Sequence, residues 1–215
     1  MPLPRTGVRD ATLPPVPNDD TRPLVGDELV PGATVAMNRV AVLEYSAEAI
    51  WPWLAQLGKG RAGWYMPRRL ERFLVPVPKW RGAREILPEF QQLEVGERVP
   101  DYGRDEWFEV ASIEPPKHLV YRSLRGWPGE GAWPAPGERI TPKTMVLSWA
   151  IVIEELGPEQ TKIHLRLRAR KGQSVKASRA FTLVGDQFDR ATVLLMFAGL
   201  RERLAESRGQ HPENS

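Results

Sequence analysis

The side chains that could perform chemistry are few in this sequence and widely spaced. Its three histidines, His118, His164 and His211, show none of the spacings typical of a metal site. The chain contains no cysteine, which excludes a thiolate ligand, a thiol nucleophile and a disulfide. Adjacent carboxylates occur at residues 105–106 and 154–155, but neighbours on a strand point to opposite faces, so neither pair suits two-carboxylate catalysis. The sequence therefore predicts no bound metal.

One segment has the spacing of a phosphate-binding loop. Residues 58–63, GKGRAG, match G-x-G-x-x-G, which in dinucleotide-binding folds follows a strand and opens a helix. Here the segment follows a predicted helix, so we interpret Gly58 as the residue that caps that helix and the rest as a flexible loop. With no Walker A or G-x-S-x-G sequence elsewhere, we expect no cofactor.

Aromatic side chains are the other group that could form a site, and the chain contains 8 tryptophans. Such rings either pack in the core or line a cavity, and composition does not separate the two possibilities. Core packing explains most of the rings in question, which are Trp51, Trp53, Trp64, Tyr65, Trp107, Tyr121, Trp127, Trp133 and Trp149.

A row of basic residues follows one predicted strand, residues 160–171. Apolar side chains alternate there with His164, Arg166, Arg168 and Arg170, which must share the opposite face. The row could bind an anion or a nucleic-acid backbone. We favour a solvated outer face of the sheet, since 30 basic and 27 acidic residues leave a net charge of only +3, and we expect no nucleic-acid partner.

A long C-terminal helix, residues 178–206, is the predicted organising element. Its apolar residues recur at helical spacing and form a stripe: Phe181, Val184, Phe188, Ala191, Leu195 and Ala198. The stripe is widened by Leu194, Phe197 and Leu200. Most of its charged residues, including Arg203, are predicted to lie away from this stripe. A helix of this length needs a large apolar partner surface.

Strand-like segments can supply that surface. Strands are predicted at residues 35–45, 105–113, 118–125, 143–156 and 160–171, with a further strand at the end of residues 87–99. Ser46 is a predicted N-cap of a helix over residues 47–57, which Pro52 should divide into two short helices, and residues 66–74 could add another helical turn. Strands and helices are segregated, which indicates an α+β fold. The long loop at residues 126–142 has the length of a lid.

The 215 residues fit one domain with extensions. We expect a proline-rich, partly disordered arm at residues 1–32, a domain at residues 33–207 and a disordered tail at residues 208–215. The longest apolar runs fall short of the ~20 residues of a membrane span, and the N-terminus lacks the apolar core of a signal peptide. We therefore expect a cytoplasmic protein with no membrane span, a monomer or a weak homodimer.

Four stretches together resemble a bacterial group of the START-like, or SRPBCC, superfamily. They are IWPWLAQLGKGRAGWY (50–65), LVGDELVPG (24–32), ILPEFQQLEVGERV (86–99) and LLMFAGLRERLAE (194–206), of which the first is the most specific. The resemblance implies a helix-grip fold, in which a curved antiparallel sheet of six or seven strands wraps around the long C-terminal helix, with two short helices after the first strand. It also implies a deep apolar cavity between sheet and helix. Members of the superfamily carry lipids, sterols or other hydrophobic ligands, or cyclise and dehydrate polyketides.

The resemblance has one departure, at residues 66–71. The chain reads MPRRLE, where relatives usually carry a serine, an aromatic and an acidic residue before Leu-Glu. If those polar residues contact a ligand in relatives, this chain has lost them or has changed its ligand.

Three functions follow as hypotheses. The first is the binding of a small hydrophobic or aromatic ligand in a cavity lined by Trp64, Tyr65, Trp107, Tyr121, Trp149, Phe188, Leu195 and Met196, with Arg61 at its entrance for an anionic or carbonyl group. The second is a cyclase or dehydratase, whose general acid or base would come from Tyr65, Tyr121, Asp186 and Glu109. The third is an interaction module that uses basic surfaces.

Overall fold

The computed structural model describes residues 22–75, 81–101, 106–125, 133, 144–172 and 179–210, with side chains described in the last range from residue 190 to residue 209. The first 21 residues of the predicted arm, nearly all of the predicted lid, the end of the tail and the side chains of Asp186 and Phe188 lie outside the described residues. The limits that we predicted for the domain therefore stay predictions.

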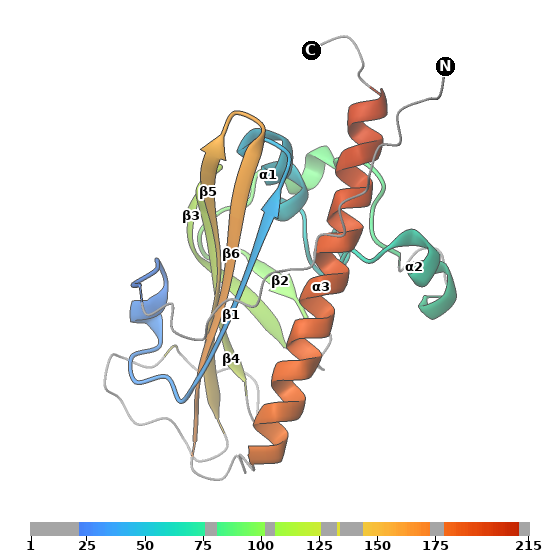
Figure 1. Cartoon of the computed structure of the whole chain (residues 1–215). Helices are drawn as coiled ribbons and strands as arrows, with labels where there is room; N and C mark the ends of the chain where they lie inside the picture. Colours follow the sequence, from blue (N-terminus) through green and yellow to red (C-terminus); the bar gives the residue numbers. More distant parts are fainter. Residues whose placement is uncertain are drawn as a thin grey trace.

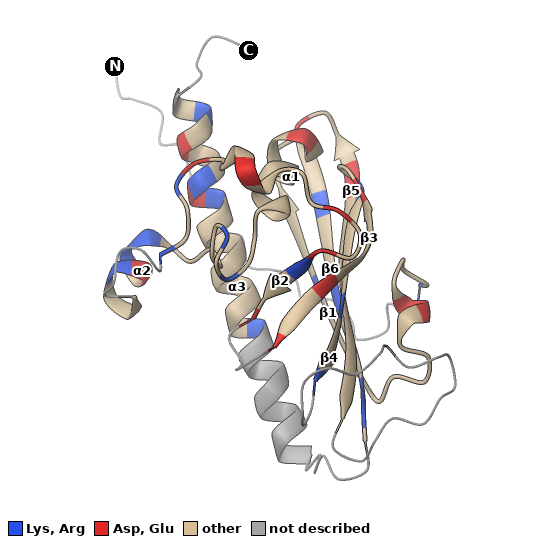
Figure 2. Ribbon diagram, turned by 180° about the vertical axis from the view of Figure 1, so that it is seen from behind, with Lys and Arg blue, Asp and Glu red and all other residues tan. Residues whose placement is uncertain are grey.

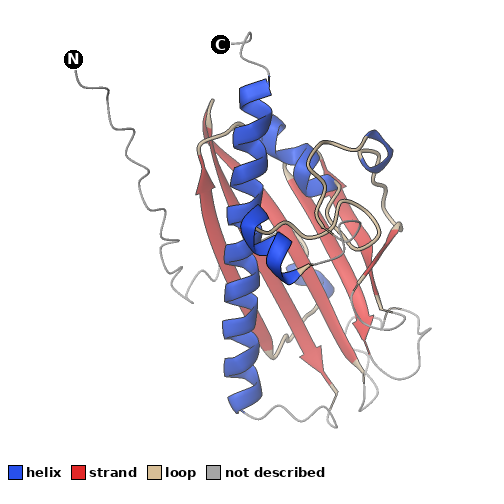
Figure 3. Ribbon diagram, turned by 90° about the vertical axis from the view of Figure 1, so that its right-hand side faces the viewer, coloured by secondary structure: helices blue, strands red, loops and turns tan. Residues whose placement is uncertain are grey.

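The described residues form two layers, an antiparallel sheet and one long helix that lies along its inner face (Figures 1 and 3). The strands are β1 (Val35–Leu43), β2 (Arg98–Pro100), β3 (Trp107–Glu114), β4 (His118–Arg125), β5 (Met145–Gly157) and β6 (Gln160–Lys171). Their order in the sheet is β1-β6-β5-β4-β3-β2. The helices are α1 (Ala47–Ala55), α2 (Arg68–Leu74) and α3 (Arg179–Gln210), with 3-10 turns at Asp27–Leu29 and Pro88–Phe90. This architecture confirms the predicted α+β helix-grip fold with six strands.

The inner face of the sheet carries the apolar half of each alternating strand. Trp149 of β5 is paired in register with Tyr121 of β4 on one side and with Leu167 of β6 on the other. Ile151 and Leu165 continue this row and are buried in the hydrophobic core together with α1 and α3. The strand alternation therefore positions aromatic rings in the middle of the sheet, facing α3.

Helix α1 corrects one prediction, because it continues through Pro52 as a single helix. The Ser46 side chain caps it by accepting a hydrogen bond from the Ala49 N–H at 3.3 Å. Pro52 removes one helical hydrogen bond, but the side chains around it, Trp51, Trp53 and Leu54, are all buried. Burying each of them stabilises the helix by about 1.5–3 kcal/mol, which outweighs that loss. The second short helix is α2, beyond the loop that follows α1.

Helix α3 confirms the predicted C-terminal helix, and its buried stripe matches the predicted one in part. Phe197 and Leu200 are buried as predicted, whereas Leu194 is exposed. Ala191 is exposed, and Leu195 and Ala198 are only half-buried. Among the described residues of α3, the buried side chains are Val193, Met196, Phe197, Leu200, Arg203 and Leu204. An arginine thus occupies a position that its charge had assigned to solvent.

The outer face of the sheet is also covered at its centre, so the predicted solvated row is wrong at two positions. Arg166 is 4% exposed and His164 is 2% exposed. The Arg166 guanidinium lies 2.7 Å from the Asp27 carboxylate and donates to Asn38 Oδ1 at 2.6 Å. Gly26 packs so tightly against Val120 that a Cβ there would lie 2.6 Å from a Val120 methyl group. Residues 22–32 therefore lie along the sheet, and Arg166 holds them there.

The described helices include none that is both long enough and apolar enough to cross a bilayer.

Candidate functional site

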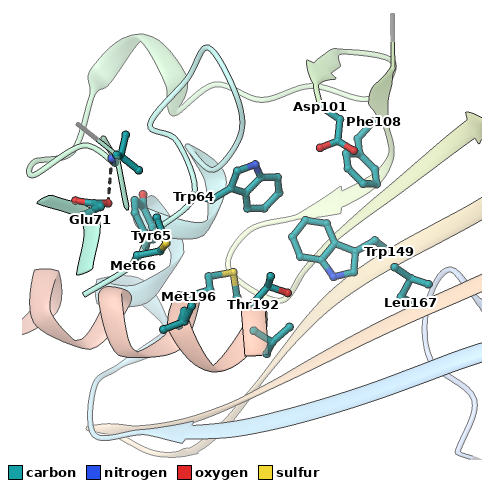
Figure 4. Close-up of a pocket in the computed structure, with 14 residues that line it drawn as sticks. Trp64, Tyr65, Met66, Glu71, Asp101, Phe108, Trp149, Leu167, Thr192 and Met196 are labelled. Carbon is teal, nitrogen blue, oxygen red and sulfur yellow. Dashed lines mark hydrogen bonds between the residues drawn. The ribbon is translucent and has the colours of Figure 1, made fainter. Parts of the chain in front are cut away.

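A cavity of about 450 Å³ lies between the inner face of the sheet, helix α3 and the segment that leads into α2 (Figure 4). Aromatic and aliphatic side chains make up most of its lining: Trp64, Tyr65, Met66, Val75, Phe108, Trp149, Leu167, Val193, Leu195 and Met196. The remaining lining residues are Glu71, Gly82, Asp101 and Thr192. A cavity of this size and character is typical of small-molecule sites.

Five of the predicted lining residues border this cavity: Trp64, Tyr65, Trp149, Leu195 and Met196. Phe188 lies outside the described side chains. Three predicted residues do not line the cavity, each for a different reason: Tyr121, Trp107 and Arg61. Contact of any of these residues with a ligand stays a prediction.

Tyr121 lies behind the lining, because strand pairing sets it beside Trp149. The two rings are stacked, with centroids 5.8 Å apart and planes 18° apart. Trp149 also packs against Trp64 at 5.4 Å and Phe108 at 5.8 Å. Ring pairs at these separations attract one another. Trp149 is therefore fixed in place by three other rings and presents a rigid wall to the cavity.

Trp107 lies on the outer face of the sheet, where Arg98 stacks over its ring at 4.5 Å. Phe108, the next residue on β3, points inward and lines the cavity instead. The signal was present in the sequence, since the charged Glu109 separates the apolar Phe108 and Val110. Successive strand residues alternate between faces, so an inward Val110 requires an inward Phe108 and an outward Trp107.

Arg61 is bound to protein groups and does not line the cavity. Its guanidinium lies 2.6 Å from Glu97 Oε1 and donates to the backbone carbonyls of Ala55 and Phe90 at 3.2 and 2.9 Å. It also lies over the Phe90 ring at 4.7 Å. Arg61 therefore joins the loop after α1 to the segment before β2.

The G-x-G-x-x-G segment folds back on itself. Gly63 donates to the Gly58 carbonyl at 2.9 Å and Gly58 donates to the Gly63 carbonyl at 3.2 Å. Helix α1 already ends at Ala55, with Gln56 as its cap, so Gly58 is not the cap that we predicted. Gly58 has a φ of 133° and packs against Val99, where a Cβ would approach to 2.3 Å. These amides bond within the loop, which leaves them unsuited to cradle a phosphate.

Two carboxylates line the cavity, and an arginine neutralises each of them. Glu71 Oε1 lies 3.0 Å from Arg203 Nη2 and accepts a hydrogen bond from the Gly82 N–H at 3.1 Å. Asp101 Oδ2 lies 2.6 Å from Arg125 Nη2, and Arg125 stacks over the Phe108 ring at 4.8 Å. Neither carboxylate was predicted from the sequence. Their partners come from distant elements, so no local spacing marks them.

Arg203 is the most constrained of these groups, with an exposure of 0%. It donates to the backbone carbonyls of Ala83, Met66 and Gly199 at 2.7, 3.2 and 3.0 Å. Its guanidinium also lies over the Tyr65 ring at 4.5 Å. A single side chain of α3 therefore holds both α2 and the loop that precedes β2 against the cavity wall.

Two buried tyrosines differ in how their hydroxyl groups are satisfied. Tyr65 donates to the Trp53 carbonyl at 2.8 Å and accepts from Gln56 at 2.9 Å. The Tyr121 hydroxyl has no hydrogen-bond partner among the described residues. Burial raises the pKa of both phenols above the ordinary value of about 10. Both therefore stay neutral at physiological pH.

This difference leads to a prediction. Tyr65→Phe is expected to lower the free energy of unfolding by about 1–2 kcal/mol, because Gln56 and the Trp53 carbonyl would lose a buried partner. Tyr121→Phe, the matched control, should change it by less than about 0.5 kcal/mol or raise it, since it removes an unpaired buried hydroxyl. Urea titration of the two variants measures both values. An equal loss in both would show that the Tyr121 hydroxyl is satisfied by a partner such as buried water.

The remaining predicted catalytic candidate, Glu109, lies on the outer face of the sheet and pairs with Arg122. A serine–histidine pair that the sequence analysis missed is on that face too. Ser112 Oγ lies 2.9 Å from His118 Nε2, and His118 Nδ1 lies 3.9 Å from Glu114. Glu114 is exposed and ion-paired to Lys117. We assign this group to holding the β3–β4 turn, because it lies across the sheet from the cavity.

Within the described ranges, no three His, Cys, Asp or Glu side chains are close enough together to hold a metal ion.

Comparison with known proteins gives little beyond this geometry. No protein-family profile matches the chain, and no curated protein is similar to it in sequence. Among solved structures, the chain is similar to MLL2253 of Mesorhizobium loti, with 16% identity over 80% of this chain and 98% of that one and a TM-score of 0.44. It is also similar to a conserved protein of Geobacillus kaustophilus, with 15% identity, coverage of 80% and 97%, and a TM-score of 0.42. CalU16 of Micromonospora echinospora is 11% identical, with coverage of 81% and 83% and a TM-score of 0.40. These scores are too low to assign a ligand or an activity.

Proposed function

We propose that this chain is a START-like, SRPBCC-type protein that binds a small hydrophobic or aromatic molecule in the cavity between the sheet and α3. The observation that carries the proposal is the lining of that cavity, where Trp64, Phe108 and Trp149 form one wall and Met196 of α3 faces them (Figure 4). Both carboxylates at its margins are paired with arginines. The lining therefore offers apolar contact and no uncompensated charge, which favours an uncharged ligand.

The apolar surface that a ligand can bury in the cavity limits its affinity. A ligand that loses ~300 Å² of apolar surface would gain about 7 kcal/mol before ordering costs. With no ordering cost, this gain corresponds to a Kd of about 10 μM. The translational and rotational freedom lost on binding makes the affinity weaker than that. A rigid aromatic ligand would lose the least conformational freedom on entering.

Native mass spectrometry of the purified chain, followed by extraction and identification of any bound molecule, tests the proposal. A stoichiometric apolar compound would support it and name the ligand class. An empty protein whose melting temperature is unchanged by a panel of aromatic and lipid compounds would refute it.

A pair of variants on α3 tests whether the ligand binds in this cavity. Leu195 lines the cavity, whereas its neighbour Leu194 is exposed. Leu195→Trp should fill part of the cavity and weaken ligand binding roughly tenfold or more, a loss of about 1.4 kcal/mol. Leu194→Trp, the control, should leave the affinity unchanged. Isothermal titration with the identified ligand measures both, and equal affinities would mean that the ligand binds elsewhere.

A second function is favoured by one observation. Asp101 and Glu71 both line the cavity, each beside an arginine, and the arginine beside Glu71 lies over the Tyr65 ring. A cyclase or dehydratase needs an acid or base of this kind beside its substrate. Mass spectrometry of the bound compound over time separates a dehydratase from a carrier, because a dehydratase would release it with one water lost and a carrier would return it at the same mass. A cyclisation that loses no water leaves the mass unchanged, so a change in chromatographic retention at constant mass identifies a cyclase.

A cytoplasmic location, the absence of a nucleic-acid partner and a monomeric or weakly dimeric state stay predictions from the sequence.

A further inference from the structure

Helix α2 carries the most exposed apolar side chain among those described. Phe73 is 83% exposed and its neighbour Leu74 is 55% exposed. The helix stands away from the two layers of the fold (Figures 1 and 2). A phenylalanine that stays in water contributes none of the free energy that its burial would supply. An exposed Phe-Leu pair on a projecting helix therefore points to a surface that binds a partner.

The charges around this pair define the partner. Arg69 and Arg72 of α2 are both exposed. Neither has an ion pair within the part of the chain that the structure describes. The acidic residue of the helix, Glu71, is buried and bound to Arg203, so it does not offset them. The exposed surface of α2 therefore combines large apolar side chains with positive charge alone.

We propose that α2 docks on an anionic lipid surface, with Phe73 and Leu74 inserted into the interface and Arg69 and Arg72 on the headgroups. Apolar side chains flanked by arginines are the combination that binds peripheral proteins to such surfaces. Two apolar residues are too small a patch for a stable protein interface, but they suffice for insertion at a lipid surface.

Docking would also bring the cavity to the lipid. Glu71 and Val75, at the buried side and the end of α2, both line the cavity. The docking surface and the cavity wall are thus parts of one segment. The docking itself needs no ligand in the cavity, so an empty cavity would leave this proposal standing.

The test is sedimentation of the full chain with vesicles of phosphatidylcholine alone or of equal parts phosphatidylcholine and phosphatidylglycerol. We expect binding to the anionic vesicles that is roughly tenfold or more stronger and that falls as salt is raised. Phe73→Ser/Leu74→Ser should weaken it roughly tenfold, and Arg69→Gln/Arg72→Gln should weaken it by a similar factor on anionic vesicles only.

Leu156→Ser is the matched control, because Leu156 is also exposed but lies at the end of β5, far from α2 (Figure 1). It should bind as the unaltered chain does. All substituted side chains are exposed, so melting temperatures should be unchanged. Equal binding to both kinds of vesicle, loss in the Leu156 variant to the same degree, or no binding at all would overturn the proposal; the last result would leave an acidic protein surface as the partner of α2.

Discussion

Replacing Arg203 by methionine is expected to lower the free energy of unfolding by about 3–5 kcal/mol, the largest effect of any single substitution considered for this chain. Arg203 is fully buried, and its removal would leave the buried Glu71 carboxylate without its counter-charge. The backbone carbonyls of Ala83 and Met66, which lie outside α3, would lose this donor at the same time. Each buried acceptor left unpaired adds to the loss. Urea-induced unfolding followed by circular dichroism measures the change.

Two further variants make this prediction specific. Arg208 lies on the same helix and pairs with Glu159 at the surface, where both side chains are more than half exposed. Arg208→Met should therefore cost at most about 1 kcal/mol. Arg203→Met/Glu71→Gln should be less destabilised than Arg203→Met alone, because the uncompensated charge is removed. If the double variant were the less stable of the two, the buried carboxylate would not be the source of the loss.

Periodicity predicted most of this fold because each strand and helix buries one face. Apolar and polar residues alternate from Ile163 to Arg170, and the strand has the predicted bounds, residues 160–171. The long helix was also recognisable, since its apolar residues recur over several turns. Such patterns depend only on residues that are close in the chain, so a single sequence is enough to predict these strands and helices.

The buried charges could not be predicted in the same way. Arg203 and Arg166 satisfy their guanidinium groups with Glu71 and Asp27, which lie 132 and 139 residues away in the chain. A charged residue is assigned to solvent unless its partner is known. The predicted stripe on α3 was displaced for this reason, and the outer face of β6 was predicted to be solvated.

The candidate site was predicted in part, and the errors come from strand alternation and from contacts between distant residues. Trp64 and Trp149 were identified by ring type, and both line the cavity. Ring type also favoured Trp107 over Phe108, although the alternation of β3 requires the opposite choice. Asp101 lies in the lining because Arg125, on another strand, orients its carboxylate, and no spacing within the sequence indicates that contact.

The contact between α3 and the cavity wall provides the second large prediction. Gly199 packs directly on the backbone of Met66, and a Cβ at this position would lie 2.5 Å from the Met66 carbonyl carbon. The Met66 backbone has little freedom to move, because its carbonyl oxygen accepts a hydrogen bond from Arg203 on the same helix. Gly199→Ala should therefore lower the free energy of unfolding by about 2 kcal/mol, even though alanine is the better helix former.

Substitution of Gly209 is the control that distinguishes this packing effect from the effect of helix propensity. It lies in the same helix, and a Cβ there would meet nothing within 4 Å. Gly209→Ala should consequently leave stability unchanged or raise it by up to about 1 kcal/mol. The two substitutions are chemically identical, so opposite signs in urea titration can arise only from what surrounds each glycine. A gain at both positions would mean that α3 can move away from Met66 at no cost, and the cavity wall would then be a sliding contact and not a fixed one.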